Sequence, residues 1–113
     1  MIKADELRCK CCGAIDLDLD FLHRLNFARG MAGIPFVIDS GYRCEKHNKK
    51  VGGKPNSAHR YGTAADIRCE TSRERYTMLK ALFAAGFNRI GIGKTFLHVD
   101  LDTGKDQEVI WLY

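Results

Sequence analysis

Residues 57–69 read Ser-Ala-His-Arg-Tyr-Gly-Thr-Ala-Ala-Asp-Ile-Arg-Cys, and this stretch predicts a polar loop that runs into a strand. The loop, residues 54–63, is rich in turn-forming residues and carries His59. The strand is expected over residues 64–69 and carries Asp66. Gly62 lies between these two residues and lets the chain turn. We therefore expect the side chains of His59 and Asp66 to lie close together.

Outward from this stretch, the chain mixes helices and strands without regular alternation. Apolar residues recur at helical spacing in two segments, and Thr71 with Glu74 forms a possible capping box. Met78, Leu79, Leu82 and Phe83 are the predicted buried face of the helix that this box begins. The sequence predicts helices over residues 18–30, 44–51 and 71–85, and strands over residues 34–39, 64–69, 89–92, 96–101 and 108–113. This order favours an α+β fold with a largely antiparallel sheet flanked by helices.

The length of 113 residues fits one domain over residues 1–113, with a cysteine-rich segment, residues 1–16, packed on it. The formal charge of +4 is compatible with a polyanionic partner, but the basic residues form no dense run typical of nucleic-acid binding. No stretch is apolar enough to cross a membrane, and residues 1–6 lack the apolar core of a secretory signal. We therefore expect synthesis in the cytoplasm, no integral membrane segment, no nucleic-acid partner and a monomer.

Five cysteines are many for this length, and their number is odd. Cys9, Cys11 and Cys12 cluster near the start, whereas Cys44 and Cys69 stand apart. A zinc ribbon has two separate pairs of cysteine ligands, and the cluster of Cys9, Cys11 and Cys12 supplies only one close group. Buried free thiols with one disulfide are therefore favoured over a structural metal at Cys9, Cys11 and Cys12, and both alternatives stay open.

His98 lies in the middle of a predicted strand, where alternation places His98 and Asp100 on one face and Leu97 and Val99 on the other. Together with His59 and Asp66, His98 completes a set of two imidazoles and one carboxylate. Such a set typically holds a catalytic Zn²⁺ and leaves a fourth position open for water. A surface histidine and a turn aspartate would give the same pattern, so spacing alone leaves both interpretations open.

Three blocks of the sequence resemble the zinc D-Ala-D-Ala carboxypeptidase and murein endopeptidase family, in particular its small phage-type members. Ser40-Gly41-Tyr42-Arg43, followed by His47-Asn48, is similar to the first block of the family. Residues 57–66 are similar to its second block, SxHxxGxAxD, and residues 96–100 are similar to its third block. Hedgehog signalling domains share the fold of this family. The resemblance implies that His59, Asp66 and His98 bind one catalytic Zn²⁺, that Arg43 binds and polarises the substrate, and that Ser57 contacts the substrate or supports the site.

One position departs from the family pattern, because no carboxylate occupies residues 93–96, where several relatives carry the general base. Asp100 is the nearest replacement, and we place a catalytic role slightly ahead of a role in orienting His98. Glu45 and His47 are weaker candidates, and His23 is expected to be structural. Trp111 and Tyr113 are expected in the core or along the substrate groove.

The resemblance thus implies a zinc peptidase that cuts stem or cross-link peptides of peptidoglycan, as a D,D-carboxypeptidase or an endopeptidase. A phage or prophage lysis role would explain a wall hydrolase that is made in the cytoplasm and acts at the cell wall or in the periplasm after release. The alternative is a zinc-containing module of the same fold that binds the wall without chemistry.

Overall fold

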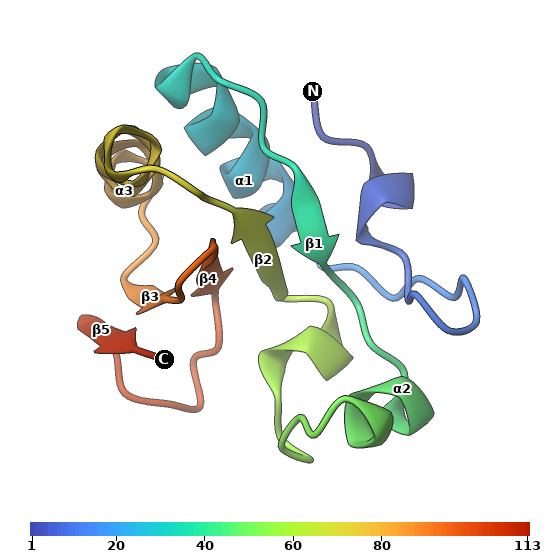
Figure 1. Ribbon diagram of the computed structural model, residues 1–113. Helices are drawn as coiled ribbons and strands as arrows, with labels where there is room; N and C mark the ends of the chain where they lie inside the picture. Colours follow the sequence, from blue (N-terminus) through green and yellow to red (C-terminus); the bar gives the residue numbers. More distant parts are fainter.

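The computed structural model describes all residues from 1 to 113 and arranges ten short elements around one sheet (Figure 1). In chain order these are η1 (Ala4–Leu7), α1 (Leu19–Ala32), β1 (Ile38–Ser40), α2 (Glu45–Lys50), η2 (Ala58–Tyr61), β2 (Ala64–Arg68), α3 (Ser72–Ala84), β3 (Arg89–Ile92), β4 (Phe96–Asp100) and β5 (Val109–Leu112), where η marks a 3₁₀ helix. None of the helices is long and apolar enough to span a bilayer.

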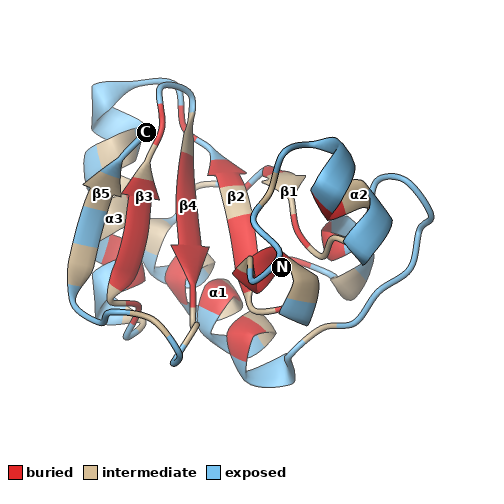
Figure 2. Ribbon diagram, turned by 90° about the horizontal axis from the view of Figure 1, so that it is seen from below, coloured by how far each residue is buried: buried red, intermediate tan, exposed pale blue.

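The five strands form a single sheet in the order β1-β2-β4-β3-β5 (Figure 2). The pairs β1–β2, β2–β4 and β3–β4 are antiparallel, and only β5 lies parallel to its neighbour β3. The expected α+β fold with a largely antiparallel sheet is therefore confirmed.

Two helices cover one face of this sheet and bury the core against it (Figure 2). Phe21 of α1 packs edge-on against Phe87, with ring centroids 5.8 Å apart. Ile67 of β2, together with Leu97 and Val99 of β4, points into the same apolar cluster. Because side chains alternate along a strand, the neighbours of these residues point to the opposite face, which α1 and α3 leave uncovered.

The two longer helices begin at the residues that the sequence predicts. The Asp18 carboxylate accepts a hydrogen bond from the Phe21 backbone N–H at the start of α1. Thr71 and Glu74 cap each other reciprocally at the start of α3, which confirms the capping box. The predicted burial of Phe83 is wrong, since that side chain is 46% exposed.

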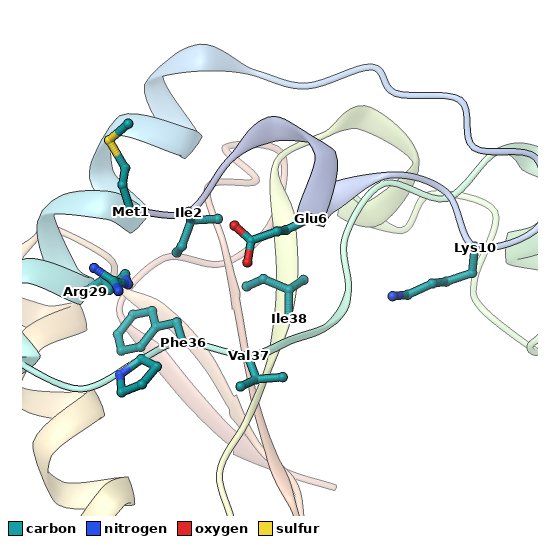
Figure 3. Close-up of a pocket in the computed structure, with 9 residues that line it drawn as sticks. Met1, Ile2, Glu6, Lys10, Arg29, Phe36, Val37 and Ile38 are labelled. Atoms are coloured by element: carbon teal, nitrogen blue, oxygen red, sulfur yellow. The ribbon is translucent and has the colours of Figure 1, made fainter.

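The strand predicted over residues 34–39 is the main correction, because β1 begins only at Ile38. Pro35 has no N–H to donate to a ladder, and the buried Phe36 turns into the core. Residues 35–38 instead line a pocket of about 380 Å³ against the N-terminal segment (Figure 3). This pocket holds no histidine, cysteine or aspartate, so it offers none of the chemistry expected of the site.

Candidate metal centre

Three side chains converge on the sheet face that the helices leave open. Asp66 of β2 lies directly opposite His98 of β4 in the antiparallel register, so both side chains project from the same face. His59 approaches from η2, where Gly62 ends the turn in the left-handed conformation. The Asp66 Oδ1 atom lies 3.3 Å from His59 Nε2 and 3.0 Å from His98 Nδ1. The convergence expected from the sequence is therefore present.

The second nitrogen of each imidazole has a partner that fixes the orientation of the ring. His59 Nδ1 lies 2.7 Å from the carbonyl oxygen of Gly41, so it carries the proton and donates. His98 Nε2 lies 2.7 Å from Asp100 Oδ2. Each ring therefore turns its other nitrogen, Nε2 of His59 and Nδ1 of His98, toward Asp66. Metal-binding histidines are typically held in this way by a carbonyl or a carboxylate.

Asp100 is held by a buried arginine and does not face the pocket. Its side chain is 2% exposed, and its Oδ1 accepts a hydrogen bond from Arg89 Nε at 2.7 Å. Its second oxygen is occupied by His98. Both oxygens of this carboxylate thus have protein partners, an arrangement suited to orienting His98. Arg89 also stacks on Trp111, with its guanidinium carbon 5.0 Å from the ring centroid.

The charges of these groups depend on one another. Burial alone would raise the pKa of Asp66, but hydrogen bonds from His59 and His98 hold it well below its usual range. Burial alone would lower the pKa of His98, but its hydrogen bonds to Asp100 and Asp66 raise it. Without a cation, the two carboxylates thus favour a proton on His98. A bound cation would supply the positive charge instead.

The spacing of the three ligand atoms fits a zinc ion. Ligand atoms about 2.0 Å from a tetrahedral ion lie about 3.3 Å from one another. The two measured contacts to Asp66 Oδ1 are close to this value, and all three donor atoms lie within 4.8 Å of one another. The donor set, two imidazole nitrogens and one carboxylate oxygen, is also one that Zn²⁺ prefers.

A pocket of about 390 Å³ opens over the three side chains. Arg43 and Ser57, to which the family resemblance assigns substrate or supporting roles, also line this pocket. Arg43 Nη2 lies 3.5 Å from Asp66 Oδ2, and its side chain is 15% exposed. The Ser57 Oγ accepts a hydrogen bond from the His59 backbone N–H at 3.3 Å, so this hydroxyl caps η2 and holds His59. Asp66 is the only carboxylate side chain in the lining.

Several residues that the sequence did not single out complete the site. The buried Asn48 accepts from Arg43 Nη1 at 3.4 Å and donates to the Lys54 carbonyl at 2.7 Å. Ser40 Oγ accepts from Arg43 Nε at 3.2 Å. Ser40 and Asn48 lie in the SGYR–HN block, so their position beside Arg43 in that block was the available signal. The contact of Arg89 with Asp100 depends on the pairing of β3 with β4, which the sequence alone does not give.

Aromatic residues of the last strand wall one side of the site. The ring of Trp111 lies 5.5 Å from that of His98, and Tyr113 lines the pocket. Glu45, His47 and His23 are not part of the pocket lining: Glu45 and His47 lie on α2, and His23 is exposed on α1. The groove-wall alternative thus agrees with the position of Tyr113, whereas Trp111 packs on His98 and Arg89 and is not part of the pocket lining.

The fold and the site together define a small α+β protein with a histidine–aspartate–histidine centre of the kind found in metallohydrolases. A family model described as peptidase M15 matches residues 2–102. The chain therefore belongs to the peptidase M15 family, which is zinc-dependent, and is a peptidase of that family. Comparison with curated proteins gives no match.

Proposed function

We propose that this chain is a zinc-dependent peptidase that hydrolyses stem or cross-link peptides of bacterial peptidoglycan. The observation that carries this proposal is the convergence of His59 Nε2, Asp66 Oδ1 and His98 Nδ1 at the floor of a pocket lined also by Arg43. The membership of the chain in the peptidase M15 family supports peptide-bond hydrolysis. The resemblance to wall-lytic relatives supports the substrate class.

Different residues of the chain bind the metal, bind the substrate and orient the substrate-binding arginine. His59, Asp66 and His98 would hold a zinc ion, which would supply an activated water as nucleophile and polarise the scissile carbonyl. Arg43 lies beside Asp66 and presents a planar set of donors to a substrate carboxylate or to the developing oxyanion. Asn48 and Ser40, neither of which lines the pocket, accept hydrogen bonds from the guanidinium and hold it in place.

The charge of the pocket suits a peptide that carries carboxylates. Arg43 and Lys54 line the pocket together with a single aspartate, Asp66, whose charge bound zinc would offset. Peptidoglycan stem peptides end in a free carboxylate, which such a lining attracts. Both D,D-carboxypeptidase and endopeptidase action are compatible with a pocket of this kind.

For Asp100 we propose an orienting role ahead of a catalytic one. Its two oxygens contact His98 and Arg89, and the side chain is buried. A general base must reach the attacking water, and His98 lies between Asp100 and Asp66. Arg89 balances the charge of Asp100, which keeps the carboxylate ionised as a hydrogen-bond acceptor for His98.

The proposal is tested by incubating purified protein with defined muropeptides, with and without a chelator, and identifying the products by mass spectrometry. We expect chelator-sensitive cleavage that zinc restores, and the masses of the products identify the bond. His59→Ala should abolish turnover, whereas His23→Ala, an exposed histidine on α1, should retain it. Equal product release by the wild type and by His59→Ala would refute the proposal.

A second candidate, a zinc-containing module that binds the wall without chemistry, is favoured by one observation. The pocket lining contains no carboxylate other than the ligand Asp66 that could serve as a general base. This candidate predicts zinc in the protein and retention on wall fragments, with no product after long incubation. A lysis role in a phage or prophage, action at the cell wall after release, and a monomeric state stay predictions from the sequence.

A further inference from the structure

A second cluster of metal-binding side chains lies outside the peptidase site, where the N-terminal segment meets α2. Cys9, Cys11 and Cys12 come from the segment, and Cys44 immediately precedes α2. Cys9 and Cys44 are 35 residues apart in the sequence, yet their sulfur atoms lie 3.6 Å apart. The fold thus supplies the fourth cysteine that the spacing of the first three lacks.

The sulfur atoms are arranged around a common centre and not as one bonded pair. Cys11 Sγ lies 3.6 Å from Cys9 Sγ and 3.3 Å from Cys44 Sγ. All four sulfurs, including that of Cys12, lie within 4.8 Å of one another, and every cysteine is a free thiol. Sulfurs about 2.3 Å from a tetrahedral zinc ion lie about 3.8 Å apart, whereas a disulfide bond is only about 2.0 Å long.

The backbone around the cluster supports thiolates. The Cys44 N–H points at Cys9 Sγ, and the His47 N–H points at Cys44 Sγ, each at 3.4 Å. Hydrogen bonds of this kind stabilise sulfur ligands that carry negative charge. The turn between Cys9 and Ala14 is closed by two backbone hydrogen bonds, which turn Cys11 and Cys12 back toward Cys9.

Apart from these hydrogen bonds, the loop has no buried side chains to hold it against the rest of the protein. Ile2, Leu7 and Cys9 are buried, but residues 10–16 contain no buried side chain. A loop without buried apolar surface gains little stability from packing. A metal bound to the four sulfurs would connect this loop to the residue that follows Arg43.

From this geometry we propose that Cys9, Cys11, Cys12 and Cys44 form a structural Zn²⁺ site, distinct from the peptidase centre. Four thiolate ligands leave no open position, which is typical of a structural zinc ion and not of a catalytic one. The site holds the exposed loop of residues 10–16 against the start of α2. Binding requires the thiols to lose their protons, so zinc uptake releases protons to the solvent.

The first test is elemental analysis of the protein purified under reducing conditions with zinc present. We expect a Cys11→Ser/Cys12→Ser double variant to contain one zinc per chain fewer than the wild type. Both substituted residues are exposed, so folding should be retained, and circular dichroism checks this. Cys69→Ala removes a cysteine outside the cluster and should leave the zinc content unchanged. His59→Ala should lose the zinc of the peptidase centre and keep the thiolate-bound one.

A second measurement reports the ligands directly. Titration of the zinc-free, reduced protein with Co²⁺ should produce intense sulfur-to-cobalt charge-transfer absorption in the wild type and in His59→Ala, and none in Cys11→Ser/Cys12→Ser. Zinc should then displace the cobalt and remove the absorption. Equal zinc contents in the wild type and the double variant would overturn the proposal. So would three titratable thiols instead of five in the denatured, unreduced protein, because that count indicates a disulfide.

Discussion

At the scale of single residues, the shape of Arg43 matters as much as its charge. Its guanidinium is held by Ser40 and Asn48 and reaches Asp66 Oδ2. Lysine keeps the charge but has no planar fork to contact all three partners. We therefore expect Arg43→Lys to lower kcat/KM about 100-fold, the loss typical of removing one preorganised donor to an oxyanion, with the zinc content unchanged.

Steady-state kinetics on a defined muropeptide, together with elemental analysis, checks this expectation. Arg68→Lys is the matched control, because Arg68, at the end of β2, also pairs with an aspartate, Asp39, but is not part of the pocket lining. Activity of Arg43→Lys equal to that of the control would show that Arg43 acts only through its charge.

Asp100→Asn separates the two roles considered for this carboxylate. If Asp100 orients His98, the weaker acceptor should lower zinc affinity about 10- to 100-fold, and excess zinc should restore turnover. If Asp100 acts as a base, turnover should be lost while zinc affinity stays normal. Because Arg89 would lose its buried counter-charge, thermal unfolding of the zinc-loaded variant must be measured alongside.

Competition with a chromogenic chelator gives the zinc affinity of the Asp100→Asn variant. Asp39→Asn provides the comparison, since Asp39 is a partly exposed aspartate paired with an arginine on the same sheet. We expect zinc-dependent rescue for Asp100→Asn. Loss of turnover with unchanged zinc affinity would show instead that Asp100 acts as a catalytic base.

Single residues also mark the limit of prediction from sequence. His59 and Asp66 could be placed together because a loop and a turn join them, and Arg43 was implied by the resemblance of its block to the family. Arg89 and the carbonyl of Gly41 could not be placed, since their roles arise from strand register and from a backbone atom that carries no residue-specific pattern. Cys44 likewise joins the other cysteines only through tertiary folding.

At the scale of elements, close packing between β3 and β5 positions the aromatic wall. Gly91 is in register with His98 on one side and with Trp111 on the other. A Cβ atom at this position would lie 2.6 Å from Trp111 Nε1 and 2.6 Å from Tyr113 Cε2. Gly91→Ala should therefore displace both rings and lower activity and stability together, by an amount typical of overpacking, about 1–3 kcal/mol in unfolding free energy.

Fluorescence of Trp111, the only tryptophan, reports the displacement, and urea unfolding gives the free energy. Gly30→Ala is the control, because Gly30 lies inside α1 with no atom near the added methyl group. That variant should gain about 0.5–1 kcal/mol from higher helix propensity. An unchanged emission spectrum of Gly91→Ala would contradict the close packing.

The elements that the sequence predicted well are those with local signals at their ends. The reciprocal cap of Thr71 and Glu74 and the capping carboxylate of Asp18 mark where α3 and α1 begin. The strand over residues 34–39 was placed too early because an apolar run does not distinguish a ladder from a buried loop. The parallel pairing of β5 with β3 depends on the path of a long turn, which local patterns do not encode.

At the scale of the whole molecule, one apolar cluster connects the helices with the back of the metal-binding strands. Phe21 is fully buried and packs on Phe87, whereas Phe83, on α3, is half exposed. Replacing a buried phenylalanine by alanine typically lowers the unfolding free energy by about 3–5 kcal/mol, out of a total of about 5–15 kcal/mol for a domain. We therefore expect Phe21→Ala to approach the limit of stability and Phe83→Ala to lose less than about 1 kcal/mol.

Because Ile67, Leu97 and Val99 alternate with the ligand-bearing positions of β2 and β4, the core and the site should unfold together. Urea unfolding followed by Trp111 fluorescence at the site and by far-ultraviolet circular dichroism of the helices should give coincident transitions in the wild type and in both variants. Phe21→Ala should shift both curves to lower urea concentration by the same amount. Loss of the fluorescence signal before the helical signal would show instead that the metal-binding face unfolds separately from the helices that support it.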